Sequence, residues 1–368
     1  MSFEVVYTSA RRGLREGASG FCTVAATEGI PRLLHQKLES LSGYRHTEVT
    51  AGRPLPVNYS HVTVRLQRNF YHVVSRISDA GIDYSGRTNK IAHHLALTSS
   101  ELSHFPDGPA ALLLDDSYWY SEWNGSPQNL PPDRLPHSVA EHGNAFATWE
   151  QVFGDSGWAG ILGRAASDGM QTVSVIVPAG RDTMSLLNEA LQLVPRHFRW
   201  KICFSTYFSQ QAPGTTCHWR FVIDGTRESR KLRARSPGIL VDPLESSGGV
   251  PEDDPFVDAV RNCTPEAVHS FFDAPQRSRL RPMSREGGEG RVTVRRRRPV
   301  ERQERRPTSP FLFDEEETND DDEEWQNDTD TRSPRRGTPS KTQVIWLVLG
   351  LLLTVVVILG VIAFRRLS

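Results

Sequence analysis

An uncharged apolar run near the C-terminus constrains this chain more than any other feature. Residues Val344 to Phe364 read VIWLVLGLLLTVVVILGVIAF, and two arginines follow them directly. At about 1.5 Å per residue, a helix of this length spans the roughly 30 Å hydrocarbon core of a bilayer. A buried core helix would need to be shorter, and this run leaves no polar face for water. We therefore expect a single transmembrane helix over residues 343–364, with a short tail at 365–368.

The residues at the ends of this helix suit the two membrane interfaces. The first residues of the chain indicate that the part before the helix is cytoplasmic. The opening MSFEVVYTSARRG lacks the basic stretch and apolar core of a signal peptide. We expect a tail-anchored, single-pass membrane protein with most of the chain in the cytoplasm. The residues that we expect at or within the membrane are Trp346, Thr354, Phe364, Arg365 and Arg366.

The four cysteines fit a reducing compartment. Cys22, Cys203, Cys217 and Cys263 show no CxxC spacing and no histidine pattern of a zinc site. Cys203 and Cys217 could face each other across a hairpin, but we interpret them as small buried apolar residues. We expect no metal site and no cofactor.

Composition changes abruptly near residue 245. Aromatic and branched apolar residues recur before this point, and about 240 residues can bury a substantial core. Beyond a short helical stretch at Phe256 to Phe272, the chain is polar and rich in Pro and Gly, a composition typical of disorder. We divide the chain into a globular domain, 1–245, a helical extension, 246–274, a disordered linker, 275–342, and the membrane segment.

The linker carries charge in blocks. Residues 277–306 contain twelve arginines and four carboxylates, and residues 314–324 contain nine carboxylates. The consecutive Arg295, Arg296, Arg297 and Arg298 could bind anionic lipid or an acidic partner. Nucleic-acid binding is a weaker interpretation, because no aromatic residue interrupts the arginine block. A plain solvated linker remains the simplest alternative.

Three apolar residues stand directly before the acidic block. Phe311, Leu312 and Phe313 lie in the sequence SPFLFDEEE. Exposed apolar triplets in disordered chains often bind partners, so we interpret these three residues as a candidate docking motif.

The first part of the globular domain alternates strands with one helix. Apolar alternation predicts strands at Phe3–Ser9 and Phe21–Ala26, and a Leu-rich face predicts a helix that begins at Pro31 and ends at Gly43. The next segments predict a hairpin, with strands at Tyr59–Leu66 and Phe70–Ile77. Further strands are predicted at Ile91–Leu97 and Ala111–Leu114.

The last part of the domain reads as strand, helix, strand. Thr172–Val177 is a β-branched strand, a helix runs from Asp182 to Val194, and Arg199–Phe208 is a second strand. This order predicts one βαβ unit with parallel strands, and Cys217–Ile223 adds a strand that we expect to be antiparallel. We predict an α+β fold with a mixed sheet, with a doubly wound α/β fold as the alternative.

Motifs of known chemistry are scarce. The sequence contains no GxxxxGK[ST], GxSxG or HExxH motif, and the fragment from Gly81 to Lys90 has the wrong spacing for a phosphate loop. We therefore lean against an enzyme.

The tract from Asp83 to His94 resembles a site more than any other part of the chain. Its sequence is DYSGRTNKIAHH, and its candidate ligand or partner residues are Asp83, Arg87, Asn89, Lys90, His93 and His94. On a strand the two histidines face opposite sides, so only one can enter a given pocket. A histidine base paired with Asp83 is conceivable. A turn that leads into a strand, with hydrogen-bonded polar side chains, is the simpler alternative.

Several short segments carry a family resemblance. MSFEVVYTSA, GFCTVA, LESLSGYR, the tract DYSGRTNKIAHH, FSTY and CHWR look like parts of the N-terminal domain of the bacterial GTPase-associated protein family. The resemblance covers residues 1 to about 240 and carries over no catalytic residues. It implies a protein that works beside a separate GTPase, in membrane-linked signalling or in conflict systems.

Two classes of function follow. The first is a membrane-held adaptor or regulatory module that binds a partner such as a GTPase. The second is a membrane-tethered enzyme or small-ligand sensor whose pocket lies around Asp83 to His94. Convergence of these side chains in a concave pocket would favour the second class, and their dispersal would favour the first.

Overall fold

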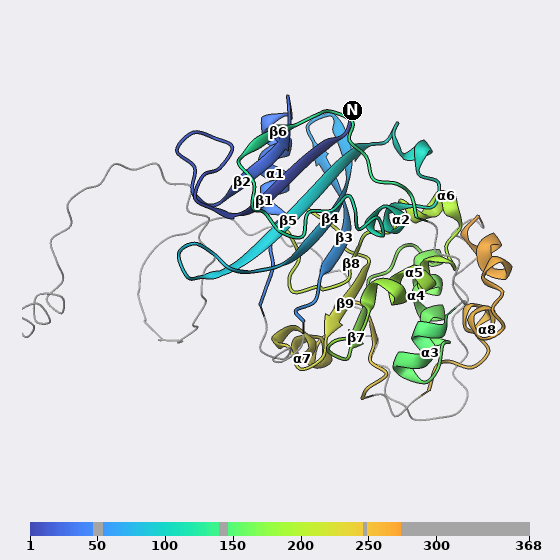
Figure 1. Cartoon of the computed structure of the whole chain (residues 1–368). Coiled ribbons are helices and arrows are strands. Elements are labelled where there is room, and N and C mark those ends of the chain that lie inside the picture. The colour runs from blue at the N-terminus through green and yellow to red at the C-terminus, as the bar shows by residue number, and fades with distance from the viewer. Residues whose placement is uncertain (47–53, 140–145, 246–248, 274–368) are drawn as a thin grey trace, which may run out of the picture. The chain divides into compact units, whose positions relative to one another are not determined.

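Ten strands form one mixed sheet in the computed structural model, which describes residues 1–46, 54–139, 146–245 and 249–273 (Figure 1). The order of the strands is β10-β7-β9-β8-β3-β4-β5-β1-β2-β6. Their bounds are β1 Phe3–Ala10, β2 Gly20–Thr27, β3 Asn58–Leu66, β4 Asn69–Ile82, β5 Thr88–Thr98, β6 Gln128–Leu130, β7 Val173–Val177, β8 Phe204–Ser205, β9 Trp219–Ile223 and β10 Ile239–Val241. A mixed sheet within a mixed α/β region is thus confirmed.

Strands β1 to β5 form the antiparallel part of the sheet. β3 and β4 make the predicted hairpin, in which Gln67 takes a positive φ of 55° at the turn. β4 pairs with β5, β5 with β1, and β1 with β2, all antiparallel. The patterns of β1, β2 and the hairpin therefore predicted these strands correctly, because successive side chains of a strand point to opposite faces of the sheet.

Strands β10, β7, β9 and β8 form the parallel part. β7 is fully buried, as expected for a strand covered on both faces, and it pairs in parallel with β9 and β10. β8 also pairs with β9 in parallel, so β7 and β8 point the same way but are not neighbours. The prediction that Cys217–Ile223, the segment that contains β9, would be antiparallel was wrong. β8 has only two residues, and the long segment after it carries the chain back to the same end of the sheet.

Helices cover both faces of the sheet. Their bounds are α1 Arg32–Ser40, α2 Pro109–Leu113, α3 Ala147–Phe153, α4 Trp158–Ser167, α5 Thr183–Leu191, α6 Arg196–Arg199, α7 Arg227–Ala234, α8 Pro255–Arg261 and the 3-10 helices η2 Leu102–His104 and η3 Pro265–Phe272. One face carries the largest core, in which Val175 and Phe221 meet residues of α4, α5 and α8. On the other face, α1 packs against β1 and β4, and Leu232 of α7 packs against Val222 of β9.

Two predicted elements differ in the structure, and two short strands were not predicted. Ala111–Leu113 belongs to helix α2, which begins at Pro109 after Gly108 (φ 92°), because a short apolar run does not distinguish a buried helix from a strand. Arg199–Phe208 holds the end of α6 and only the two residues of β8. The short strands β6 and β10 were not predicted.

The predicted helical stretch at Phe256–Phe272 is present as α8 and η3. Phe256 is fully buried and belongs to the same core as β7 and α4. The close approach of α8 to α4 depends on Gly160, where a Cβ atom would lie 2.7 Å from the backbone nitrogen of Val257. The division of the chain at residue 245 stays a prediction.

Several predicted features lie outside the described residues. They are the linker at 275–342 with Arg295–Arg298 and Phe311–Phe313, the transmembrane segment at 343–364 and the tail at 365–368. Within the part of the chain that the structure describes, no helix is long and apolar enough to cross a membrane.

Candidate functional site

The candidate tract forms the turn between β4 and β5 and the first half of β5. Asp83 lies in this turn with its carboxylate buried. Its Oδ1 atom accepts hydrogen bonds from the backbone and hydroxyl of Ser85 and from the backbone of Arg87, at 2.7 to 3.0 Å. Its Oδ2 atom accepts from the Ser9 hydroxyl at 2.8 Å and from Nη2 of Arg87 at 3.2 Å. These bonds fold the turn and attach it to β1.

This hydrogen bonding also defines the charge of Asp83. The Ser85 hydroxyl, with the other donors, stabilises the carboxylate and holds its pKa well below the usual range. A carboxylate that keeps its charge in this way is a poor proton acceptor. The structure thus gives Asp83 the properties of a structural anion.

Asn89 and Lys90 attach the same region to β1 and β2. Oδ1 of Asn89 accepts hydrogen bonds from the backbone of Ser9 at 3.1 Å and of Lys90 at 2.8 Å. The Lys90 ammonium lies 5.2 Å from the centre of the Phe21 ring, and burial lowers the pKa of this lysine to about 8. Both side chains therefore have partners within the fold.

His93 is fully buried in a polar cluster on one face of the sheet. Its Nε2 atom lies 2.9 Å from Oε2 of Glu4, and its Nδ1 accepts from the backbone of Tyr120 at 3.3 Å. The guanidinium of Arg134 binds the same carboxylate at 2.8 Å. Burial alone would raise the pKa of Glu4, but the hydrogen bonds from His93 and Arg134 outweigh burial and lower it. For His93, burial outweighs the bond to Glu4 and lowers the pKa, which favours the neutral ring.

His94 points to the opposite face. Its ring nitrogens lie 2.7 Å from the Ser75 hydroxyl and 2.9 Å from the Ser42 hydroxyl. Full burial lowers its pKa to about 3, so the ring is neutral at physiological pH. As expected for neighbouring strand residues, the two histidines occupy separate environments.

The six candidate side chains therefore do not converge on one pocket. Asp83, Arg87 and Asn89 organise the turn, while His93 and His94 bind polar groups on opposite faces of β5. The partners come from distant parts of the sequence, namely Ser9, Glu4, Ser42 and Ser75, and no local pattern singles them out. One signal was present: the short-range Asp83–Ser85 pair is typical of a side-chain-capped turn.

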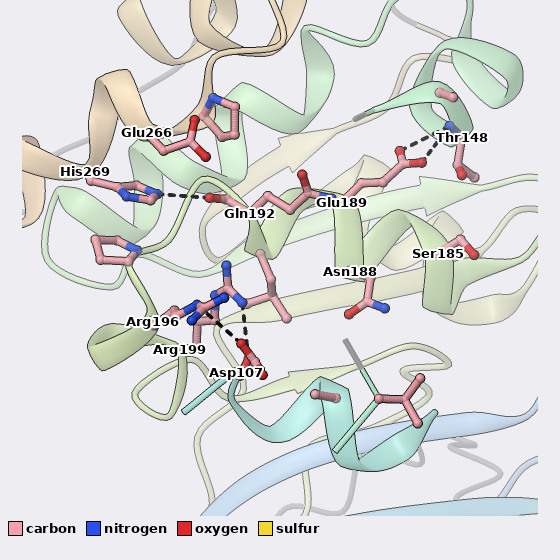
Figure 2. Close-up of a pocket in the computed structure, with 16 residues that line it drawn as sticks. Asp107, Thr148, Ser185, Asn188, Glu189, Gln192, Arg196, Arg199, Glu266 and His269 are labelled. Carbon is pink, nitrogen blue, oxygen red and sulfur yellow. Dashed lines mark hydrogen bonds and ion pairs between the residues drawn. The ribbon is translucent and has the colours of Figure 1, made fainter. Parts of the chain in front are cut away.

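A large cavity lies elsewhere, with a volume of about 1080 Å³, between α2, α5, α6 and η3 (Figure 2). At one end Arg196 forms an ion pair of 3.3 Å with Asp107. Nη1 of Arg199 donates to the backbone oxygen of Asp107, also at 3.3 Å. At the other end the Glu189 carboxylate accepts a hydrogen bond of 2.8 Å from the backbone nitrogen of Thr148, at the start of α3 (Figure 2).

The walls of this cavity carry charges of both signs that already serve the fold. Nε2 of His269 donates to the backbone oxygen of Gln192 at 3.0 Å, and the Glu189 carboxylate caps α3, whose N-cap residue Phe146 makes no side-chain cap bond. Across the described ranges, no group of His, Cys, Asp and Glu side chains could hold a metal ion. Cys22, Cys203 and Cys217 are buried thiols, and the side chain of Cys263 is exposed.

Comparison with known families assigns both parts of the sheet. Residues 1–136 match GTPase-associated protein 1, N-terminal domain type 2, and residues 146–244 match GTPase-associated protein 1, middle domain. The chain belongs to the GTPase-associated protein 1 family. No curated protein and no solved structure matches it. The family resemblance seen in the sequence is confirmed, although it comprises two family domains where we expected one.

The two domains of this GTPase-associated protein share a single sheet. β3 of the N-terminal domain pairs with β8 of the middle domain, with His61 opposite Phe204. Beside this pair, Oδ1 of Asn58 accepts hydrogen bonds from the Ser205 hydroxyl at 2.8 Å and the Tyr207 backbone at 3.1 Å. The cavity in Figure 2 also lies between them, because Asp107 belongs to the N-terminal domain and Arg196 to the middle domain.

Proposed function

We propose that this chain is a tail-anchored interaction module that works beside a separate GTPase at the cytoplasmic face of a membrane. The family assignment supports an association with a GTPase. The sequence of residues 344–364 supports the anchor, since its length and composition match a bilayer span. Tethering raises the effective concentration of the module near a membrane-bound partner without any new contact.

The side chains of Asp83 to His94 are dispersed, and this observation favours an interaction module over an enzyme. An enzyme or ligand sensor at this tract needs several of these groups to face one substrate. Here Asp83 is held by Ser9, Ser85 and Arg87, and the two histidines lie on opposite faces of the sheet. These groups stabilise the fold, so binding through an outer surface is the function that the geometry favours.

Copurification from native membranes tests this proposal. Tagged full-length chain is compared with a chain that ends at Thr342, and copurifying proteins are identified by mass spectrometry. We expect a GTPase to be enriched with the full-length chain and to be reduced or lost with the shortened one. Enrichment of no GTPase with either chain would contradict the partnership.

A matched pair of variants distinguishes the effect of losing the membrane anchor from the effect of deleting the residues after Thr342. Leu351→Arg with Val356→Arg places two charges in the apolar run, each opposed by about 2.5–3.5 kcal/mol at the centre of a membrane helix. Leu351→Ile with Val356→Ile keeps the run apolar. We expect alkaline carbonate to extract the arginine variant and to leave the isoleucine variant in the membrane. Extraction of both variants would contradict the tail anchor.

A further inference from the structure

Exposed apolar side chains gather at one end of the antiparallel strands. Ile82 is 67% exposed, Tyr84 is 44% exposed and Phe21 is 39% exposed. They come from the β4–β5 turn and from the start of β2, which lie next to each other. We call these three residues, together with the exposed Arg11, Arg12 and Arg87, the hairpin tip.

The hairpin tip is organised before any partner arrives. The Arg11 guanidinium lies 5.2 Å from the centre of the Tyr84 ring, which joins the β1–β2 loop to the β4–β5 turn. Asp83 links the same two segments through Ser9 and Arg87. Gly81, in the irregular end of β4, and Gly86, in the turn, take positive φ angles of 71° and 82°. Preorganised side chains lose little conformational entropy when they bind.

The charge of this surface is positive. Arg11 lies over Tyr84, its neighbour Arg12 is exposed and Lys90 lies over Phe21, whereas the carboxylate of Asp83 is buried and bonded to Arg87. Glu16 is the exposed carboxylate of the β1–β2 loop. Apolar and aromatic side chains surrounded by cations are the chemistry that enters the interface of an anionic bilayer.

We propose that the hairpin tip contacts the surface of an anionic membrane. This inference rests on the proposed membrane tether, and it names the part of the folded region that meets the lipid. Ile82 and Tyr84 enter the headgroup region, and the arginines bind lipid phosphates and carboxylates.

Two observations favour a bilayer over other acidic partners. None of the tip's residues lines the cavity of Figure 2, the pocket between α1 and β8 or the pocket beside α7, so the tip offers a peptide none of these three grooves. Cations also lie against both of its rings, which leaves less of each ring face for stacking on nucleic-acid bases. The Lys90 ammonium lies 5.2 Å from the centre of the Phe21 ring, and the Arg11 guanidinium lies 5.2 Å from the centre of the Tyr84 ring.

A fluorescent probe on the full-length chain tests the contact. The environment-sensitive dye NBD is attached through Ile82→Cys in a Cys263→Ser background, because the other three cysteines are buried. The control carries the dye on native Cys263, which is exposed between α8 and η3. Both proteins are reconstituted into phosphatidylcholine vesicles, with or without 30% phosphatidylserine.

We expect a blue-shifted emission and quenching by spin-labelled lipid at position 82 only in the vesicles with phosphatidylserine. The emission of the probe on Cys263 should be the same in the two kinds of vesicle. Arg11→Gln with Arg12→Gln should lower the ratio of docked to undocked tips by up to about 25-fold, since each cation near the surface contributes about fivefold. The matched change on α7, Arg227→Gln with Arg230→Gln, should leave the signal unchanged.

Equal emission at position 82 in the two kinds of vesicle would overturn the inference. So would a tip that binds single-stranded DNA or an acidic protein while the probe stays in water. Alkaline carbonate extraction tests the membrane anchor separately: if the anchor is absent, carbonate releases the full-length chain. In that case flotation of the same labelled chain with preformed vesicles still reports whether the tip prefers anionic lipid.

Discussion

Oε2 of Glu4 lies 2.9 Å from Nε2 of His93, and both side chains are almost completely shielded from water. Glu4 belongs to β1 and His93 to β5, so this contact crosses two paired strands. Arg134 binds the same carboxylate and lies 4.4 Å from the centre of the Tyr118 ring. The three residues thereby attach the segment between α2 and α3 to the antiparallel strands.

Removing the charge of Glu4 should destabilise the folded region. We expect Glu4→Gln to lower the free energy of unfolding by about 3 kcal/mol, because His93 and Arg134 lose the carboxylate that compensates their burial. Urea unfolding monitored by tryptophan fluorescence measures this change. Glu16→Gln, in an exposed loop, is the matched control and should have little effect. A loss below about 1 kcal/mol for Glu4→Gln would show that the cluster contributes little.

Acid should destabilise the protein through its buried histidines. Burial lowers the pKa of His61 and of His94 to about 3. The unfolded chain binds protons on these rings near pH 6.5, so the free energy of unfolding falls as the pH drops below that value. Each ring contributes a slope of about 1.4 kcal/mol per pH unit between its two pKa values.

His94→Gln tests this slope, because an amide can still bind Ser42 and Ser75 but cannot titrate. Between pH 6 and pH 5 we expect the variant to lose about 1.4 kcal/mol less stability than the original chain. Urea titrations at the two pH values provide the measurement. Equal slopes for His94→Gln and the original chain would refute the prediction.

A methyl group at Gly160 should disturb the packing of α8 on α4. The new Cβ would lie 2.7 Å from the nitrogen of Val257 and 2.8 Å from the carbonyl carbon of Phe256, and backbone atoms cannot move aside cheaply. We expect Gly160→Ala to lower the free energy of unfolding by about 1–3 kcal/mol.

Gly43→Ala is the control for this substitution. The nearest atom to its Cβ would be Nε2 of Gln210 at 4.0 Å, so we expect no loss of stability. Both variants are compared by urea unfolding. Equal stability of the two variants would mean that α8 is not seated on α4 as described.

Thiol reactivity should follow burial. In the folded protein we expect one rapidly reacting thiol, Cys263, while Cys22, Cys203 and Cys217 react only after unfolding. Burial also raises the pKa of Cys217 to about 12, which further reduces its thiolate. Titration with Ellman's reagent, with and without guanidinium, counts the two classes. Fewer than four thiols in denaturant without reductant would reveal a disulfide and contradict this assignment.

Local sequence patterns predicted the elements whose signal is contained in one segment. β1, β2, α1 and the β3–β4 hairpin were found because alternation or a Leu-rich face repeats over several turns or residues. β8 and α2 were missed because a strand of two residues and a buried helix of five carry too little periodicity. The direction of β9 depends on the path of the preceding loop, which local patterns do not encode.

The tract from Asp83 to His94 shows the same difference between what local patterns predict and what long-range contacts determine. Its sequence correctly placed Asp83 in a turn and put His93 and His94 on opposite faces of a strand. It could not predict that Ser9, Glu4 and Ser42 would meet these side chains, because each pairing joins residues far apart in the chain.

The family resemblance, the mixed α/β composition and the apolar run that supports an anchor follow from the amino-acid sequence alone, since they depend on composition and short-range order. The folded structure was needed to show that two family domains share one sheet and that the polar tract serves the fold. It was also needed to show that the exposed cations and rings gather at one tip. Strand pairing, burial and long-range hydrogen bonds arise when distant segments come together, and their energies depend on that arrangement.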